Sequence, residues 1–537
     1  MHDPSGTSAI RSTRIARPLP RRPIALAAAF AAVLAIVSVA GCRKSGQISS
    51  PEPPQADGAY GASAPFDPVA VNGPIFVDWP APRLAMVFTG DQMGYLEPCG
   101  CAGLENQKGG LARRHRLLEE LRERGWPVLA ADVGGQIRRF GRQSEIKFHT
   151  TLDALQTMQY EAVGLGPADL GLPTEDLVAA STNLATGDES HLVSANVGLL
   201  GFDAGFTRRW RIVERGGVRV GIAAVLGARH LPGLAQLDEI ETLPPAEALA
   251  EIVPQLEGQA DVLVLLAYTD REEANELAGA FPQFDLVVVA EGGEEPPSQP
   301  LWANDEQTMI VEVGHKGMYA AVVGVAEADG PALVYQRVPL DSRFQPTPEM
   351  TTLMASYLDQ LREAGFDGLG LQPIVHPRGH DGDAALGALA GSATCGECHT
   401  AAYAVWEKSK HAHATESLAR LDPPRLVDPE CVSCHTTGWN PQEYFPYTTG
   451  FWSTDETPHL VGNGCENCHG PGAAHTAAER ARGAERDLVL RDRLRAQMRL
   501  TRLVAQEQVC ERCHDLDNSP DFQFETYWPK VEHRGLK

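Results

Sequence analysis

Apolar and polar positions alternate in blocks through the middle of the chain, and these blocks predict strands and helices in turn. Short apolar runs at 84–88 and 128–131 have the length of buried strands. Stretches such as 111–124 carry leucines at helical spacing, which predicts amphipathic helices. Further strands are predicted at 218–225, 261–267 and 284–289, and further helices at 246–256, 271–280 and 349–364. Alternating strands and helices are typical of an α/β layered domain, here spanning 83–342.

The first 82 residues show a different pattern. Five arginines precede an apolar run at 24–39, and the segment ends in Val39-Ala40-Gly41-Cys42. This ending resembles the bacterial lipobox, so we expect residues 1–42 to be a lipoprotein signal peptide and Cys42 to be lipidated. An uncleaved membrane anchor is the alternative. Residues 43–82 are rich in proline, glycine and serine without apolar periodicity, which predicts a flexible linker.

The C-terminal third has shorter apolar stretches than the middle of the chain. We expect a helix and linker over 343–390 and a mainly α-helical domain over 391–537. The clearest predicted helices are 400–418 and 488–506, the second because Leu490, Leu494 and Met498 recur at helical spacing.

Charge and cysteine distribution narrow the possible functions. The chain of 537 residues has 46 lysines and arginines against 70 aspartates and glutamates, a formal net charge of -24. Such an acidic chain is poorly suited to nucleic acid, which requires a basic face. Eight of the eleven cysteines lie between Cys395 and Cys513. Their spacing carries most of the chemical information in the sequence.

Those eight cysteines form four Cys-x-x-Cys-His motifs. The motifs are Cys395-Cys398-His399, Cys431-Cys434-His435, Cys465-Cys468-His469 and Cys510-Cys513-His514. Two cysteines at this spacing can form thioethers to one haem, and the adjacent histidine then becomes the fifth ligand of its iron. Zinc ribbons also use paired Cys-x-x-Cys, but four consecutive histidines after such pairs favour four covalently bound haem c groups.

Residues 391–537 resemble the cytochrome c-554 family. The resemblance rests on the motifs together with Trp406-Glu407-Lys408-Ser409-Lys410-His411, His475 after the third motif, and Trp528 to His533. It implies that His411, His475 and His533 coordinate neighbouring haems from the distal side. His459 and His413 are further candidates. The family includes one haem without a distal ligand, so it matters whether His435 is opposed by a residue such as His459.

Residues 83–342 resemble calcineurin-type metallophosphoesterases of the 5′-nucleotidase branch. The resemblance rests on Asp91, the Gly109-Gly110-Leu111-Ala112-Arg113 turn, Asp132-Val133-Gly134-Gly135, Gly166-Pro167-Ala168-Asp169 and Ser194-Ala195-Asn196. The positions where that family has metal ligands hold Met93, Gly135, Pro167-Ala168, Tyr268 and Gly293. A two-metal site needs a bridging carboxylate and several imidazoles. We therefore expect the phosphoesterase fold without its catalytic site.

Cys99 and Cys101 follow Asp91 closely. As thiolates they could bind copper(I) or zinc, with Asp91 or His115 completing the ligand set. A disulfide between them would be strained and easily reduced, so a redox site or a structural disulfide is equally compatible with the sequence.

These observations favour a cell-envelope tetrahaem cytochrome that carries electrons, with the α/β domain as a docking or redox-input module. One alternative is a haem-dependent oxidoreductase acting on a small nitrogen species at an open iron, and another is a metal-dependent phosphoesterase. The acidic balance predicts a redox partner protein with a basic docking surface. We expect attachment to a membrane through the N-terminal lipid, facing the periplasm or cell surface. Because Arg43 follows Cys42, outer-membrane sorting is favoured in a Gram-negative host.

Overall fold

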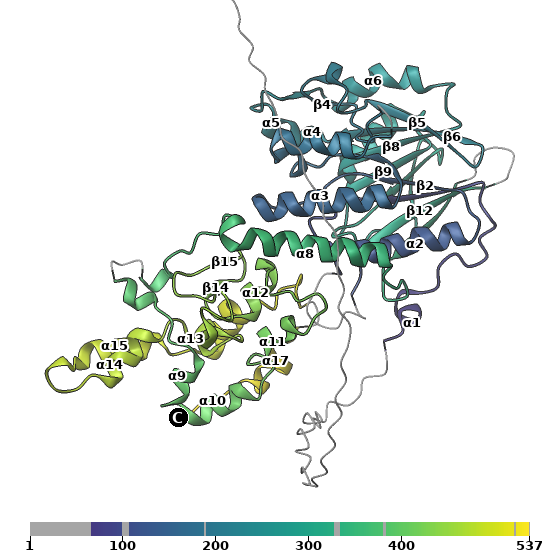
Figure 1. Cartoon of the computed structure of the whole chain (residues 1–537). Coiled ribbons are helices and arrows are strands. Elements are labelled where there is room, and N and C mark those ends of the chain that lie inside the picture. The colour runs from purple at the N-terminus through teal and green to yellow at the C-terminus, as the bar shows by residue number, and fades with distance from the viewer. Residues whose placement is uncertain are drawn as a thin grey trace, which may run out of the picture. The chain divides into compact units, whose positions relative to one another are not determined.

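The computed structural model describes residues 66–98, 107–186, 189–326, 333–379, 383–519 and 522–535 (Figure 1). They belong to one compact unit, Ala64–Lys537. The predicted signal peptide, Cys42, Cys99 and Cys101 lie outside the described residues. None of the helices in the described ranges has the length and apolarity that a membrane span requires.

The α/β domain contains two sheets. The first has the order β13-β12-β1-β2-β3, in which β1, β2 and β3 are parallel. The second has the order β10-β11-β9-β8-β6-β5. The first sheet comprises β1 (Leu84–Thr89), β2 (Val128–Asp132), β3 (Tyr160–Val163), β12 (Tyr319–Val325) and β13 (Leu333–Pro339). The second comprises β5 (Trp210–Arg215), β6 (Val218–Leu226), β8 (Val262–Asp270), β9 (Leu286–Glu291), β10 (Leu301–Ala303) and β11 (Thr308–Glu312), and β4 (Val197–Leu199) pairs separately with β7 (Ile240–Thr242).

Helices follow the strands as the apolar blocks predict. They are α2 (Leu111–Glu123), α3 (Arg142–Thr157), α4 (Thr174–Asn183), α5 (Leu231–Leu234), α6 (Pro245–Leu256), α7 (Arg271–Ala280) and α8 (Pro348–Gly368). The predicted α/β fold class is therefore confirmed. The Ser194-Ala195-Asn196 segment precedes β4 rather than forming it, and Asn196 instead joins two segments through its amide group, donating to the carbonyls of Leu226 and Leu243.

The core lies between the sheets and on their outer faces. In β8, Val264 and Leu266 belong to the same apolar cluster as Val87 of the first sheet. The intervening Leu265 packs instead with α6 and α7 residues such as Leu249 in a second cluster. This alternation follows the two-residue period of a strand, so the second sheet is buried on both faces.

The C-terminal domain consists of short helices joined by loops. The helices are α9 (Ser392–Gly396), α10 (Thr400–Glu407), α11 (Ala414–Ala419), α12 (Pro429–His435), α13 (Cys465–His469), α14 (Ala473–Arg480), α15 (Leu488–Gln497), α16 (Arg502–Val504) and α17 (Phe524–Tyr527), with a small hairpin of β14 (Trp439–Asn440) and β15 (Phe445–Pro446). The predicted mainly helical class is confirmed.

Two predicted helices of this domain are wrong in their length. The helix expected over 400–418 is divided into α10 and α11, and the one expected over 488–506 ends at Gln497. In the turn between α10 and α11, the carbonyl of His411 accepts a hydrogen bond from the backbone N–H of Asn463. Contacts with distant segments therefore override the local helical pattern.

The predicted linker over 43–82 is also wrong in its last part. Residues 68–72 form α1 (Pro68–Asn72), which Asp67 caps through its side chain. Phe76 is 7% exposed and belongs to the main core. Trp79 stacks on Trp126 with ring centres 6.2 Å apart. The α/β domain thus begins well before its first strand.

Candidate functional site

Each Cys-x-x-Cys-His motif occupies about one helical turn. The second motif lies in α12, which Pro429 begins and Asp428 caps by accepting from the N–H of Glu430. The third coincides with α13, and the first and fourth lie at α9 and at the short helix Cys510–Arg512. Cysteines three residues apart on one turn face the same side, which suits attachment to one macrocycle. All eight cysteines are free.

Three of the four motif histidines face a second imidazole. The pairs are His399 with His475 at 6.5 Å between ring centres, His411 with His514 at 6.1 Å, and His469 with His533 at 5.7 Å. Two imidazoles that share one metal ion through bonds of about 2.0–2.1 Å have ring centres about 6 Å apart. The residues present therefore fit three six-coordinate haem irons. The partners are the three histidines for which the sequence predicts a distal role.

Backbone carbonyl groups hold two of the motif histidines through one ring nitrogen each. Nδ1 of His469 lies 2.8 Å from the Met498 carbonyl oxygen, and Nδ1 of His435 lies 2.9 Å from that of Ala414. A ring that donates from Nδ1 to a carbonyl presents its other nitrogen as a lone pair to a metal. Burial lowers the pKa of His514 to about 4 and so keeps the ring neutral, as ligation requires.

His435 differs from the other motif histidines. In the described ranges no imidazole faces it at the spacing of the three pairs. His459 is exposed in the 3₁₀ turn Pro458–Leu460. The carbonyl oxygen and the ring of His459 lie close to the Cα of Gly391. His413 is exposed and lies 3.4 Å from Glu416. Among the described residues, an iron bound at His435 would therefore have one imidazole ligand.

The cysteine side chains show which motifs are neighbours. Cys395 of the first motif contacts Cys465 of the third, and Cys434 of the second contacts Cys513 of the fourth. Cys468 of the third motif lies close enough to Cys510 of the fourth to raise its own pKa, after the larger effect of burial. The motifs are thus adjacent in the order first, third, fourth, second.

The other candidate site lies at the carboxyl ends of β1, β2 and β8. Asp91 follows β1 with a φ of 47°, a left-handed conformation that is uncommon outside glycine. Its Oδ1 accepts a hydrogen bond of 3.0 Å from the Tyr268 hydroxyl. His315 Nε2 lies 3.7 Å from the other carboxylate oxygen. Burial raises the pKa of Asp91 to about 7, against the lowering effect of the Tyr268 bond.

Tyr268 also determines what can stand at position 135. A Cβ on Gly135 would lie 2.7 Å from Cε2 of the Tyr268 ring and 3.0 Å from Oδ1 of Asp91. The tyrosine ring therefore fills the space that a metal-bridging aspartate would need. Gly135 contributes its backbone instead: its N–H donates to Asp169, and its carbonyl oxygen accepts from the N–H of Met93.

Asp132 and Asp169 have structural partners. Asp132 pairs with Arg114 at 3.4 Å, and both side chains are fully buried. Asp169 accepts from four backbone N–H groups, those of Gly135, Gln136, Ile137 and Gly166. Burial raises its pKa to about 6 although these four bonds lower it. Both carboxylates tie the strand-end loops together.

His115, one predicted partner of the Cys99/Cys101 site, points elsewhere. It is 5% exposed on α2, and its Nδ1 lies 2.7 Å from the hydroxyl oxygen of Thr347. The charges that act on its pKa come from Glu119, Glu349, Arg122 and Arg116. His115 therefore contacts the start of α8, and only Asp91 remains as a described partner of that predicted site.

Side chains of the α/β domain contact the segment that follows the fourth motif. Asp517, three residues after His514, accepts hydrogen bonds from Tyr95 at 2.8 Å, Lys316 at 2.5 Å and Arg138 at 3.2 Å. The sequence gives no sign of this role, because a lone aspartate in a loop carries no local signal.

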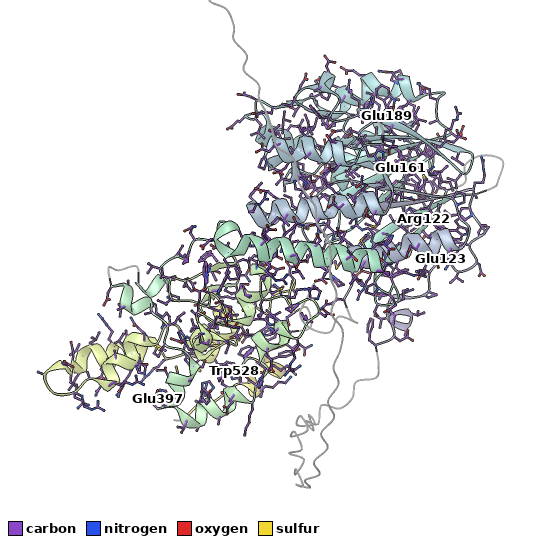
Figure 2. All side chains as sticks on the ribbon, viewed as in Figure 1. Arg122, Glu123, Glu161, Glu189, Glu397 and Trp528 are labelled. Carbon is purple, nitrogen blue, oxygen red and sulfur yellow. The ribbon has the colours of Figure 1, made fainter. Side chains whose placement is uncertain are left out.

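Figure 2 shows Glu397 of the first motif and Trp528 among the side chains of the C-terminal domain.

Comparison with known proteins assigns the C-terminal domain. Residues 394–470 match the family described as cytochrome c554 and c-prime. The chain is also similar to cytochrome c-554 of Nitrosomonas europaea, with 37% identity over 95 residues. Part of this domain is thus similar to the cytochrome c554 family. The match spans 15% of this chain and 38% of the Nitrosomonas protein.

The matched part of the C-terminal domain contains the first three motifs. The fourth motif and two of the facing histidines, His475 and His533, follow it in the sequence. The imidazole pairs nevertheless join both parts, because His399 faces His475 and His469 faces His533.

About half of the chain is similar in fold to solved phosphoesterases. A 5′-nucleotidase precursor from Thermus thermophilus is 18% identical with a TM-score of 0.44, covering 54% of this chain and 60% of that one. The calcineurin-like phosphoesterase YfkN from Bacillus subtilis is 16% identical with a TM-score of 0.40, covering 52% of this chain and 97% of that one.

Proposed function

We propose that this protein is a tetrahaem c-type cytochrome that transfers electrons in the cell envelope, with its α/β domain serving as a docking module. The three facing imidazole pairs carry the proposal, because their spacing of 5.7–6.5 Å suits one iron between each pair. Haem bound there supplies a one-electron couple at each iron, and two strong axial ligands favour electron transfer over substrate binding.

The motif order gives the proposed route. Cys395 contacts Cys465, and Cys434 contacts Cys513, while the third and fourth motifs adjoin through Cys468. Electrons would therefore pass along the motifs in the order first, third, fourth, second, or the reverse. Electron transfer through the domain requires such an unbroken series of neighbouring motifs.

The α/β domain supports the two motifs at one end of that route. Besides the Asp517 contacts at the fourth motif, buried Lys147 of α3 pairs with Glu430 of α12 at 2.7 Å. Gln143 of α3 donates to Asp428, the cap of the same helix, at 2.9 Å. The second and fourth motifs are thus fixed by charged and polar contacts with the α/β domain.

We infer that the α/β domain has no phosphoesterase activity. Tyr268 fills the space beside Gly135, and the Asp91 carboxyl is engaged by its hydroxyl. A two-metal mechanism needs a bridging carboxylate between the ions. In the described part of the chain, the strand-end residues form no cluster of three metal-ligating groups.

Export and lipidation complete the proposal. The N-terminal segment would direct the chain out of the cytoplasm, and acylation of Cys42 would hold it on a membrane surface facing the periplasm or exterior. The net charge of -24 would favour a redox partner with a basic docking surface, and this association would weaken as salt rises.

A reductive titration of the haem-loaded chain tests the electron-transfer proposal. We expect uptake of four electrons per chain and rapid reoxidation by a basic small cytochrome at low ionic strength. Uptake of fewer than four, or reoxidation that is insensitive to salt, would contradict the haem count or the partner charge respectively. Incubation with divalent metal ions and a nucleotide should release no phosphate.

His435 favours a second candidate function, a haem-dependent reaction of a small nitrogen species. The described residues offer this iron one imidazole, whereas the other three motif histidines each have a facing partner. Nitric oxide should then bind one haem in four in the visible spectrum at low concentration. Binding to none or to several haems would remove the support for this candidate.

A further inference from the structure

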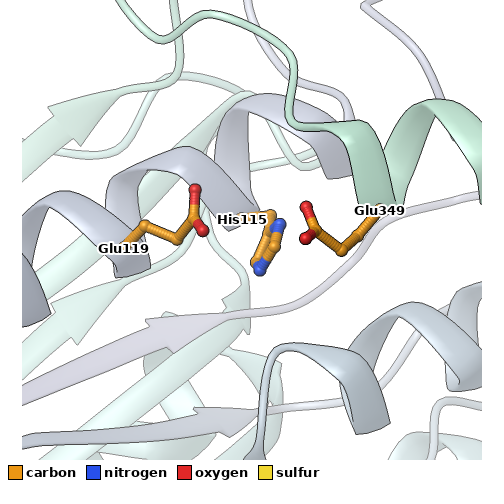
Figure 3. Close-up of side chains that lie close together, drawn as sticks. All are labelled: His115, Glu119 and Glu349. Atoms are coloured by element: carbon orange, nitrogen blue, oxygen red, sulfur yellow. The ribbon is translucent and has the colours of Figure 1, made fainter.

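A histidine and two glutamates meet where α2 and α8 approach each other, away from the haem motifs. They are His115, Glu119 and Glu349, and one ligand atom from each lies within 4.8 Å of the others (Figure 3). His115 and Glu119 are four residues apart on α2 and so share one face of that helix. Glu349 comes from the first turn of α8. Figure 3 shows the imidazole between the two carboxylates.

The imidazole of His115 is held in place by Thr347. Thr347 is the N-cap residue of α8, yet its hydroxyl makes no capping hydrogen bond to the helix. The hydroxyl lies 2.7 Å from Nδ1 of His115 instead, and both residues are about 95% buried. Metal-ligating histidines are commonly fixed by such a bond from the ring nitrogen that does not bind the ion.

One of the two carboxylates has no ion pair in the described ranges, and the other shares its arginine with two more glutamates. Within the described ranges Glu349 forms no ion pair, and neither glutamate comes within 4 Å of the imidazole nitrogens. Glu119 lies 3.5 Å from Arg116, but Arg116 also pairs with Glu120 at 3.1 Å and with Glu123 at 2.9 Å. Arg116 would therefore keep two partners if Glu119 turned to an ion.

Room for the remaining ligands is present beside the cluster. An open hollow of about 530 Å³ is lined by Glu119, Thr347 and Glu349, and also by Arg116 and by Arg343, which pairs with Asp341. Ligand atoms on one zinc ion lie about 3–4 Å apart, so a small rotation of the exposed Glu349 side chain would close the set, and water can fill the other positions.

We propose that His115, Glu119 and Glu349 bind one divalent transition-metal ion of the zinc class. One imidazole and two carboxylates suit zinc and similar ions, whereas calcium and magnesium prefer oxygen ligands alone. The ion would balance the two negative charges and link α2 to α8. The Tyr357 hydroxyl of α8 lies 3.4 Å from Asp428, which caps α12 with the second Cys-x-x-Cys-His motif. The ion would therefore link α2 to a helix that contacts this motif. The site is independent of the haem function proposed above.

Zinc titration calorimetry of the haem-loaded, chelator-treated full chain tests the site. We expect one zinc ion per chain to be lost in the double variant Glu119→Gln/Glu349→Gln, or its affinity to fall at least about tenfold. The matched control is Glu120→Gln, because Glu120 lines the same hollow and also pairs with Arg116, but is outside the cluster. The control should bind zinc as the unaltered chain does. Equal binding by all three proteins would mean an adventitious ion only and would overturn the proposal.

The single variant Glu349→Gln keeps the test valid if the double variant does not fold, since Glu349 is exposed at a helix end. Anomalous diffraction at the zinc edge gives an independent readout from zinc-treated crystals. A peak between the three side chains is expected, and its absence while zinc scatters elsewhere would also overturn the proposal.

Discussion

The α/β domain and the C-terminal domain differ in the residues that determine their folds. In the α/β domain, two sheets of five and six strands enclose a continuous apolar core, while the strand ends carry Gly135 and Tyr268 where the phosphoesterase pattern has metal ligands. In the haem domain the helices are short and the motif residues are complete. The α/β domain is therefore held together by its own apolar side chains, whereas the C-terminal domain contributes few residues to the apolar core.

The two domains should differ most in folding when the protein is produced without haem attachment. The α/β domain should fold, because its core is made by its own side chains. The C-terminal domain should not, because it contributes few residues to the apolar core, among them Val432, Trp439 and Phe451. Limited proteolysis should degrade the chain from about residue 390 onward and leave the preceding part intact. Protection of both parts would contradict the comparison.

Replacement of a facing histidine should alter one haem in four. His475→Ala, His411→Ala or His533→Ala removes one imidazole from a pair, so one iron should change from low to high spin. Electron paramagnetic resonance measures this change. His413→Ala is the control, since His413 is exposed beside Glu416, and it should leave the spectrum unchanged.

Gly135→Asp tests whether Tyr268 leaves no room for a carboxylate at position 135. The new Cβ would clash with the Tyr268 ring at 2.7 Å, and a second carboxylate would be placed beside Asp91. We expect a loss of about 4 kcal/mol or more in unfolding free energy, from overpacking together with a buried unpaired charge. Gly125→Asp is the matched control, because Gly125 also has a positive φ of 77° but no atom within 4 Å of its Cβ position. Equal losses would show that backbone strain, and not Tyr268, is responsible.

Asp91 should make the stability of the α/β domain depend on pH. Burial raises its pKa to about 7 in the folded state, whereas an unfolded aspartate titrates near its ordinary value of about 3.9. The folded state thus holds an extra proton between those values, and stability should fall as pH rises from 4 to 7. Relative to Asp91→Asn, the loss should reach up to about 4 kcal/mol. Denaturant unfolding at several pH values measures it, and parallel curves for the two proteins would contradict the assignment.

Asp517→Asn should have the smallest effect. It removes the charge that Lys316 and Arg138 share next to the fourth motif, and these groups are partly exposed. We expect about 1–2 kcal/mol of destabilisation and faster proteolysis after the fourth motif, with the haem count unchanged. Asp492→Asn, at an exposed ion pair with Arg491, should change neither property.

The sequence predicts five strands of the α/β domain, because their buried apolar runs depend on local composition, and it misses others such as β11 and β12. Leu84–Thr89 and Val218–Leu226 begin where the apolar pattern does. The four Cys-x-x-Cys-His motifs are equally clear in the sequence, because thioether attachment to a haem requires that spacing. What could not be predicted arises from contacts between distant segments, such as the division of the 400–418 helix and the pairing of His411 with His514. The enclosure of Gly135 by Tyr268, 133 positions later in the chain, is of the same kind.

The central claim is that the chain holds three irons between imidazole pairs and a fourth, at His435, with one imidazole. An electron paramagnetic resonance spectrum of the ferric, haem-loaded protein, with the haem content assayed in parallel, tests it most directly. We predict four haems per chain, three low-spin and one high-spin. Four low-spin haems would mean that His435 has a sixth ligand, and more than one high-spin haem would contradict the facing pairs.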